Sequence, residues 1–170
     1  MAVKIATKMK LSKNMIADIK TIGIIHDIGK IIIDLSILDS PNRLTEEEKN
    51  IINMHPLSGS RMLSSTHEYT RLSAGVLHHH ERIDGTGYPN GISGDSIPIE
   101  ARIISIADAY DAMTNTRPYR HTPLSKQEAI REIEENKGTQ FDSNIADIFI
   151  EKNYKKCRFN FSIKCICALR

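Results

Sequence analysis

The sequence contains no tryptophan, and aromatic residues make up only 5% of its 170 residues. Stacking platforms for single-stranded nucleic acid are therefore scarce. No apolar run approaches the roughly 18 residues that a membrane-spanning helix needs, so we expect no membrane span. An excess of one charge is lacking too, because 23 basic residues face 21 acidic ones and the net charge is +2. This balance excludes a polybasic arm as the main means of binding a partner, and it argues against a nucleic acid polymer as that partner.

Cysteine is rare and confined to one end of the chain, since all three cysteines lie between positions 157 and 170. Their spacing matches neither a zinc ribbon nor a C-x-x-C redox pair. The N-terminus shows no apolar core of a signal peptide. An odd number of cysteines without a secretion signal indicates free thiols in a reducing compartment, so we expect a cytoplasmic protein.

The hydrophobic pattern is helical nearly throughout and shows no sustained alternation of period two. Ser12 is a plausible N-cap, and Gly29 is placed to end that helix in a left-handed turn. Thr45 and Ser125, each followed by Glu at the third position, form capping boxes that open two further helices. Other helices are expected after Pro56, over 70–80, over 99–113 and around 145–149. The sequence thus predicts an all-α bundle of about six or seven helices over residues 1–152, followed by a divergent Lys- and Cys-containing tail over 153–170.

One segment breaks this helical texture. Residues 81–98 contain Gly85, Gly87, Gly91 and Gly94 together with two prolines. Long loops of this kind in compact domains are usually functional, although a plain surface excursion is the alternative. We therefore expect the loop to border a site.

Histidine and aspartate are the residues most able to carry chemistry here. The pair His26-Asp27 follows an apolar helix face, where burial of two ionisable groups is costly unless a hydrogen bond or a metal compensates. Other histidines close helices, and Asp108 lies inside the helix over 99–113. Nitrogen and carboxylate ligands without thiolate suit Fe, Mn or Zn, and one bridging carboxylate suggests two metals roughly 3.5–4 Å apart. The candidate ligands are His26, Asp27, His55, His79, His80 and Asp108.

Three basic residues follow these candidates. Lys30 is either a solvated lysine at a helix end or a cation that contacts an anionic substrate beside the metals. Arg117 and Arg120 are either ordinary surface arginines or a clamp for phosphate, which guanidinium groups bind in a bidentate manner.

Taken together, these motifs closely resemble the HD-GYP domains, a branch of the HD metal-dependent phosphohydrolases. Order and spacing both agree over residues 1–152, which makes the match far more specific than any single motif. The motifs are His26-Asp27-Ile28-Gly29-Lys30, His55-Pro56, His79-His80-Glu81-Arg82, Asp84-Gly85-Thr86-Gly87-Tyr88-Pro89, Ile106-Ala107-Asp108, Asp111-Ala112-Met113-Thr114 and Arg117-Pro118-Tyr119-Arg120.

The resemblance implies an HD fold, a centre of two divalent metals (iron or manganese) and hydrolysis of cyclic di-GMP, a bacterial second messenger. The six candidate ligands would hold the metals with Asp27 as the bridge, and Lys30 would neutralise the scissile phosphate or assist the leaving group.

The resemblance also assigns roles around the metals. Arg117 and Arg120 would hold phosphate oxygens. Gly87 and Tyr88 belong to the loop beside the substrate entrance, which is also the expected contact for a diguanylate cyclase or another signalling protein. Glu81 and Asp111 are placed to orient the ligand histidines. A homodimer is a further expectation.

The sequence departs from the family in one respect, because no histidine precedes His26. The family supplies a further histidine from the preceding helix, so we expect this chain to start within that helix and to be one ligand short. The departure keeps two alternatives open: a non-catalytic module that binds a cyclic dinucleotide or a partner protein, and a hydrolase of another cyclic dinucleotide or nucleotide. A helical protein without metal is the simplest alternative.

Overall fold

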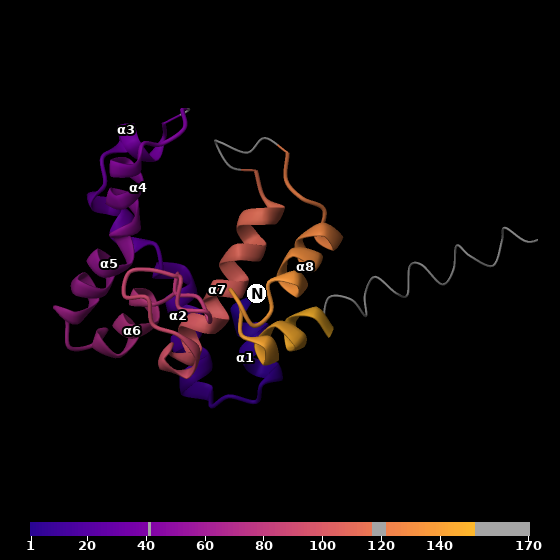
Figure 1. Ribbon diagram of the computed structural model, residues 1–170. Coiled ribbons are helices and arrows are strands. Elements are labelled where there is room, and N and C mark those ends of the chain that lie inside the picture. The colour runs from indigo at the N-terminus through magenta and orange to yellow at the C-terminus, as the bar shows by residue number, and fades with distance from the viewer. Residues whose placement is uncertain (41, 117–121, 152–170) are drawn as a thin grey trace, which may run out of the picture.

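The computed structural model describes residues 1–40, 42–116 and 122–151, in which the regular elements are helices joined by turns and loops (Figure 1). Within these residues the only extended pairing is an isolated bridge between Lys137 and Phe141. Residues 143–151 are helical as well. The helices are α1 (Ala2–Lys8), α2 (Lys13–Ile25), η1 (Ile28–Ile32), α3 (Leu35–Leu38), α4 (Glu46–Asn53), α5 (His55–Ser64), η2 (Thr70–Leu72), α6 (Ser73–Leu77), η3 (Gly94–Ser96), α7 (Ile99–Thr114) and α8 (Lys126–Glu135).

The predicted all-α class is confirmed, and local signals placed several helix starts correctly. The Ser12 side chain accepts a hydrogen bond from the amide of Met15. Both capping boxes are formed, at Thr45 for α4 and at Ser125 for α8. The described residues contain more helices than expected because short pieces such as α3 were below the length that a periodic pattern can reveal.

Two sequence-based boundaries are wrong. Gly29 does not end α2 in a left-handed turn, because α2 stops at Ile25 and Gly29 lies inside the 3-10 helix η1. The single helix expected over 70–80 is instead a 3-10 turn followed by α6, which ends at Leu77. As a result, Asp27, His79 and His80 lie in turns at the ends of helices and not inside an α-helix.

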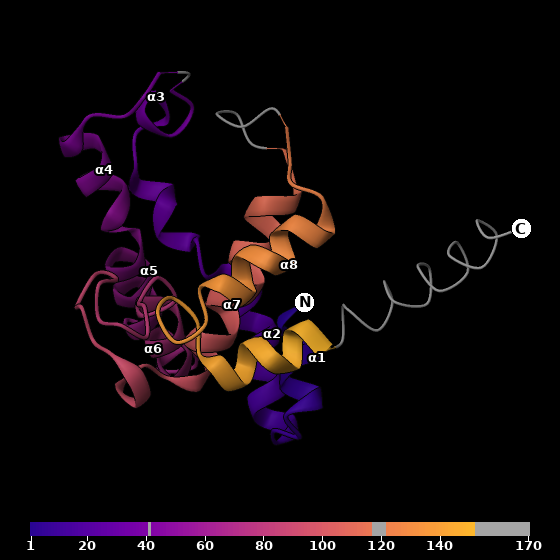
Figure 2. The same ribbon diagram turned by 45° about the vertical axis from the view of Figure 1, so that its right-hand side comes forward.

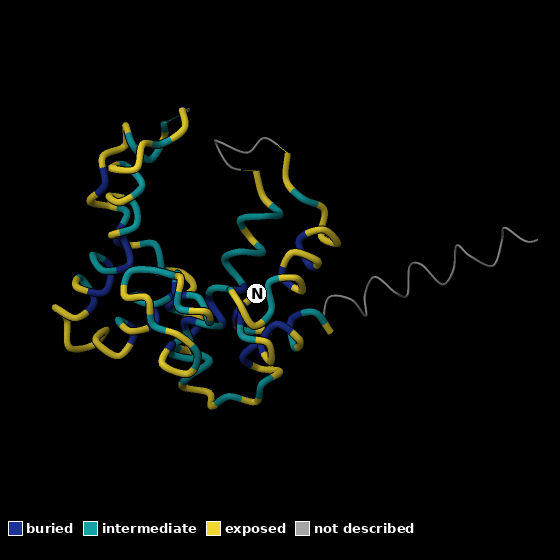
Figure 3. Tube along the Cα trace, viewed as in Figure 1, coloured by how far each residue is buried: buried dark blue, intermediate teal, exposed yellow. Residues whose placement is uncertain are grey.

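Helix α7 lies at the centre of the fold and packs against α1, α2, α6 and α8 (Figures 1 and 2). Its Ile103, Ile104 and Ile106 are fully buried, together with Ile19 and Ile22 of α2. Buried segments gather around this axis, whereas α3 and α4 project from it and are largely exposed (Figure 3). None of the helices in the described parts of the chain is long and apolar enough to cross a membrane.

Candidate metal centre

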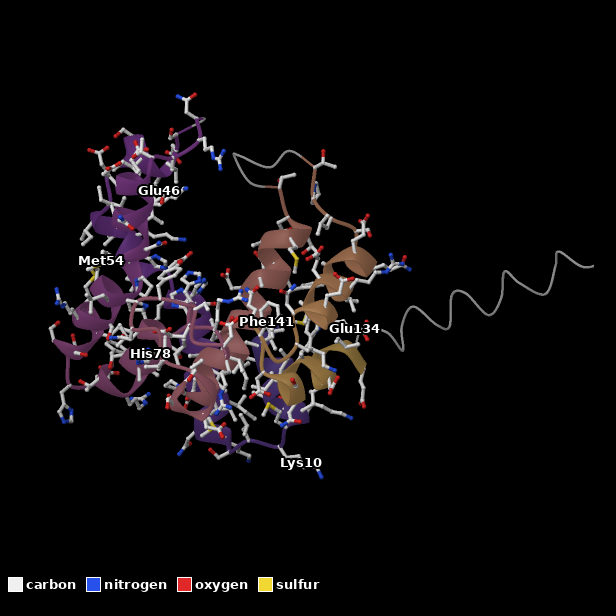
Figure 4. The ribbon with its side chains drawn as sticks, in the orientation of Figure 1. Lys10, Glu46, Met54, His78, Glu134 and Phe141 are labelled. Carbon is white, nitrogen blue, oxygen red and sulfur yellow. The ribbon has the colours of Figure 1, made fainter. Side chains whose placement is uncertain are left out.

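The candidate ligands come from four chain segments that meet beside α7. His26 caps the C-terminal end of α2, and Asp27 precedes η1. His55 is the first residue of α5, directly after Met54, which lies at the junction of α4 and α5 (Figure 4). His79 and His80 lie in the turn that follows α6, and Asp108 belongs to α7.

Close packing of η1 on α5 brings Asp27 and His55 together. A Cβ atom added to Gly29 would lie 2.0 Å from the carbonyl oxygen of His55 and 2.6 Å from the amide nitrogen of Gly59. One added to Gly59 would lie 3.2 Å from the amide nitrogen of Gly29. The two glycines therefore let the backbones of η1 and α5 touch. As a result the His55 Nε2 atom lies 3.1 Å from Asp27 Oδ1.

Four side chains form the tightest part of the cluster. Asp27, His55, His79 and His80 each offer one ligand atom, and these four atoms all lie within 4.8 Å of one another. His55 and His79 are almost completely buried, at 2% and 1% exposure. The rings of His79 and His80 are only 4.1 Å apart between centroids.

Three of the histidines hold the same tautomer. In each, Nδ1 lies within hydrogen-bond distance of the backbone carbonyl three residues earlier, and because a carbonyl only accepts, Nδ1 must carry the proton. Nε2 then presents a lone pair to the cluster. The three bonds join His26 to Gly23, His55 to Ile52 and His79 to Val76, at 3.2, 2.8 and 2.6 Å.

In this tautomer, hydrogen-bond acceptors face one another with no proton between them. The Nε2 atoms of His55 and His79 are 3.3 Å apart, and the carboxylate of Asp27 lies beside them. Burial, reinforced by the neighbouring His80, lowers the pKa of His79 to about 2, so this ring stays unprotonated near neutral pH. Neutral imidazole nitrogens converging with a carboxylate are the donor set of a divalent transition metal. The residues present therefore fit a bound cation, which would relieve the repulsion between their lone pairs.

His26 and Asp108 extend the cluster on its other side. His26 Nε2 lies 3.6 Å from Asp108 Oδ1 and 3.7 Å from Asp27 Oδ2. Burial alone would lower the pKa of His26, but the two carboxylates outweigh it and raise the pKa above its ordinary value. Asp27 thus turns one carboxylate oxygen toward His55 and the other toward His26.

Lys30 lies within this arrangement. Its Nζ donates to Asp27 Oδ2 at 2.7 Å, and both side chains are about one-third exposed. Burial would raise the pKa of Asp27, but the adjacent His55 ring and the bond and charge of Lys30 hold it well below the ordinary value. The ammonium group of Lys30 therefore reaches the same carboxylate as the histidines.

The glycine-rich loop covers His80. The Tyr88 ring stacks on the His80 ring with centroids 4.8 Å apart and 24° between planes. A Cβ atom on Gly87 would lie 2.4 to 2.6 Å from backbone atoms of residues 80–82, so this glycine permits the close approach. Burial and the charges of Asp27 and Asp108 raise the pKa of the Tyr88 phenol, which keeps it protonated.

Glu81 anchors this loop. Its buried carboxylate accepts a hydrogen bond from the amide of Asn90 at 2.8 Å and lies 3.6 Å from Nδ1 of His78, which is labelled beside α6 in Figure 4. The contacts of Glu81 are therefore with the loop and with His78, a residue outside the predicted ligand set. Sequence reasoning missed Asn90, and no local signal pointed to it.

Asp111 and the two arginines remain to be placed. Asp111 accepts a hydrogen bond from the Asn115 side chain at 2.9 Å and lines a pocket of about 460 Å³ together with His26 and Asp108. Arg117 and Arg120 lie outside the residues that the structure describes.

Comparison with known proteins agrees with this fold. The family model described as "HD domain" matches residues 1–145, so the chain belongs to the HD domain family. Two solved structures share the fold: a cyclic GMP-AMP specific phosphodiesterase of V. cholerae (TM-score 0.66, 17% identity, 96% of this chain and 44% of that one) and an HDG"Y"P protein of Bdellovibrio bacteriovorus (TM-score 0.67, 18% identity, 88% and 48%).

Curated relatives are more similar in sequence. The chain is 37% identical over 148 residues to the cyclic di-GMP phosphodiesterase response regulator RpfG of Xanthomonas campestris, covering 86% of this chain and 39% of the relative. It is 40% identical over 150 residues to a cyclic di-GMP phosphodiesterase of Thermotoga maritima, covering 87% and 40%. The chain thus spans about two-fifths of the length of these relatives.

Proposed function

We propose that this domain is a metal-dependent phosphodiesterase that hydrolyses cyclic di-GMP. The observation that carries the proposal is the convergence of unprotonated histidine nitrogens and the Asp27 carboxylate, a set of ligand atoms that suits a divalent transition metal. The curated relatives named for this activity, at 37% to 40% identity, support the choice of substrate.

We further propose two metals, iron or manganese, with Asp27 as the bridge. His55, His79 and His80 would serve one ion, and His26 and Asp108 the other, because the two oxygens of Asp27 face these two groups. When bound, such ions lower the pKa of water toward neutrality and polarise a phosphoryl oxygen.

The chain's own residues would then orient and neutralise the substrate. Lys30 is placed to move its ammonium group from Asp27 to a phosphate oxygen, since both side chains are partly open to solvent. Arg117 and Arg120 are proposed to hold further phosphate oxygens with bidentate hydrogen bonds. Tyr88, stacked on His80 with its hydroxyl protonated, can donate a hydrogen bond at the edge of the site.

The direct test is turnover of cyclic di-GMP by protein reconstituted with Mn²⁺ or with Fe²⁺ under anaerobic conditions. Wild-type protein should release a linear dinucleotide or GMP, and Asp27→Ala protein should not. Equal turnover by the two proteins would overturn the proposal. Metal content per chain, measured on the same samples, separates loss of metal from loss of chemistry.

A second substrate has its own support, because one relative, 40% identical over 121 residues, is a 3'3'-cGAMP-specific phosphodiesterase of Vibrio cholerae. Assaying cyclic di-GMP and 3'3'-cGAMP side by side distinguishes the two substrates. Binding of either nucleotide without turnover in metal-loaded protein would instead identify the non-catalytic signalling module.

Partners and location stay predictions. We propose that the loop containing Gly87 and Tyr88 also contacts a signalling protein such as a diguanylate cyclase, and that the domain works as a cytoplasmic homodimer. Co-purification with and without substitution in this loop, and the mass of the protein in solution, test these points separately.

A further inference from the structure

Positive charge is distributed unevenly along the chain. Five lysines and a single aspartate lie among the first 20 residues, so this segment carries a net charge of +4. The other 150 residues together carry −2, because the net charge of the whole chain is +2. An asymmetry of this kind is typical of a domain that contacts an anionic surface. The nearly neutral total therefore conceals one basic region.

Four of these lysines gather around the turn between α1 and α2. Their exposed side chains come from α1, from the turn and from the start of α2, and they are Lys4, Lys8, Lys10 and Lys13. Lys4 and Lys8 are four residues apart, so they share one face of α1. Lys10 lies at the lower edge of the fold in Figure 4. We call these four residues the lysine face.

The lysine face has no carboxylate to neutralise it. None of its ammonium groups forms an ion pair within the part of the chain that the structure describes. The acidic residue nearby in sequence, Asp18, is already paired with Arg71 Nε at 3.0 Å. The helix dipole favours Lys8 in the last turn of α1 but disfavours Lys13 at the start of α2, so it does not explain the cluster. An external anionic surface would relieve the repulsion between these charges.

The backbone at Lys10 supports the same conclusion independently. Helix α1 ends in a Schellman motif, in which the amide of Leu11 bonds to the carbonyl of Ala6 at 3.2 Å. The amide of Lys10 bonds to the carbonyl of Thr7 at 3.0 Å, and Lys10 takes a left-handed conformation with φ 58°. Glycine is the usual residue there, because a Cβ atom in this conformation lies too close to the backbone. The chain therefore carries a lysine where the fold alone favours glycine.

The composition of the lysine face favours a lipid surface over a protein partner. Protein interfaces are enriched in arginine and aromatic residues and depleted of lysine, whereas the lysine face consists of lysine alone. Its apolar neighbours Met9 and Leu11 pack against the core, so it offers charge and not an apolar wedge. Clusters of four or more lysines or arginines are the pattern that binds anionic lipid headgroups.

We infer that the lysine face docks this domain on an anionic lipid surface, by charge and without insertion. Lys13 is the first residue of α2 and His26 caps the opposite end, so a helix about 20 Å long separates the lysine face from the metal cluster. Docking would therefore leave the metal cluster open to a substrate in solution. The inference holds whichever substrate the metal centre takes, because it concerns another face of the fold.

Sedimentation with lipid vesicles tests the docking directly. Protein is mixed with vesicles of phosphatidylcholine alone or of phosphatidylcholine with about 30% phosphatidylglycerol, and the bound fraction is measured. Wild type should bind only the anionic vesicles, and raising NaCl from about 0.05 to about 0.5 M should abolish the binding. Equal binding to the two kinds of vesicle, or none to the anionic kind at low salt, would overturn the inference.

Two double variants that remove equal charge make the test specific to the lysine face. Lys8→Gln with Lys13→Gln should weaken binding to anionic vesicles about 25-fold, since each lysine at a lipid surface contributes about fivefold. Lys126→Gln with Arg131→Gln removes two exposed charges from α8, which lies above the α1–α2 turn in Figures 1 and 2. This control should change binding by less than about twofold, because charges beyond a Debye length are screened. Equal losses in the two variants would show that only net charge matters, against the inference.

Lys10→Gly gives a result that a purely structural residue would not. Removing the side chain relieves the left-handed backbone, so the melting temperature should rise by about 2–4 °C. Binding to anionic vesicles should fall about fivefold in the same protein. Lys10→Arg should keep both wild-type properties. A Lys10→Gly protein that binds anionic vesicles as tightly as wild type would contradict a docking role for Lys10.

Discussion

The contact between η1 and α5 makes Gly29→Ala the most informative single substitution. The new Cβ would lie 2.0 Å from the carbonyl oxygen of His55, so the first turn of α5 must move by about 1 Å to restore a tolerable contact near 3.0 Å. Because that turn carries His55, its Nε2 atom would move from 3.1 Å to about 4 Å from Asp27 Oδ1 if it followed the backbone. One small methyl group should therefore disturb both packing and metal binding.

The expected magnitudes follow from this displacement. Overpacking against rigid backbone costs about 3 kcal/mol, at the upper end of its usual range. For a chain of this size the melting temperature should fall by about 6–12 °C. Displaced ligands should weaken Mn²⁺ binding about 10- to 100-fold, comparable to the loss of a residue that orients a ligand. Thermal melts of metal-free protein and calorimetric titration with Mn²⁺ measure the two effects independently.

Two control substitutions make the result decisive. A Cβ added to Gly23, which lies within α2, would meet only the Ile104 side chain at 3.4 Å, so Gly23→Ala should keep or raise the melting temperature. Gly29→Asn separates steric contact from backbone conformation, because asparagine tolerates a left-handed cap but is larger than alanine. Asparagine should be worse than alanine at this position. A Gly29→Ala protein that melts and binds Mn²⁺ like wild type would refute the role of this packing.

Lys30→Met should lower kcat for cyclic di-GMP by about 10²- to 10³-fold, because a cation beside the reacting phosphate is lost, while metal content stays at the wild-type level in elemental analysis; an unchanged kcat would show that the pairing with Asp27 serves stability alone. With free metal at about 100 times its Kd, adding EDTA should lower the free energy of unfolding by about 2.7 kcal/mol and the melting temperature by about 5–11 °C. The shift for His55→Ala should be much smaller. Glu81→Met should lower the free energy of unfolding in urea by about 1–2 kcal/mol because the Asn90 amide loses its acceptor, whereas Glu81→Gln should keep most of it, and equal losses in the two variants would contradict the anchor.

The sequence was sufficient to predict local structure wherever a signal residue and its partner lie within one helical turn of each other. The caps at Ser12, Thr45 and Ser125 need only a side chain and an amide three residues away, and all three are formed. The central helix over 99–113 was equally visible, because its apolar residues recur with the helical period.

Long-range packing was the part that the sequence could not supply. Gly29 looks like a helix terminator when read with its neighbours, and its true partner, the His55 carbonyl, lies far along the chain. Gly59 inside a helical pattern was the available hint of a close approach. The pairing of Glu81 with Asn90 depends on how a long loop returns, which no periodicity encodes.

The histidine rings also bear on how this centre tolerates change. Because His26, His55 and His79 each bond to a carbonyl in their own preceding turn, the nitrogen that faces inward is chosen by local chain geometry. Each histidine and the carbonyl three residues before it therefore form a local unit that orients the ring. Lengthening the connections between these units should keep every Nε2 directed toward the cluster. Deleting one residue inside a unit would rotate its ring by about 100° around the helix axis. Insertions in this fold are thus safest between the helices that carry the histidines.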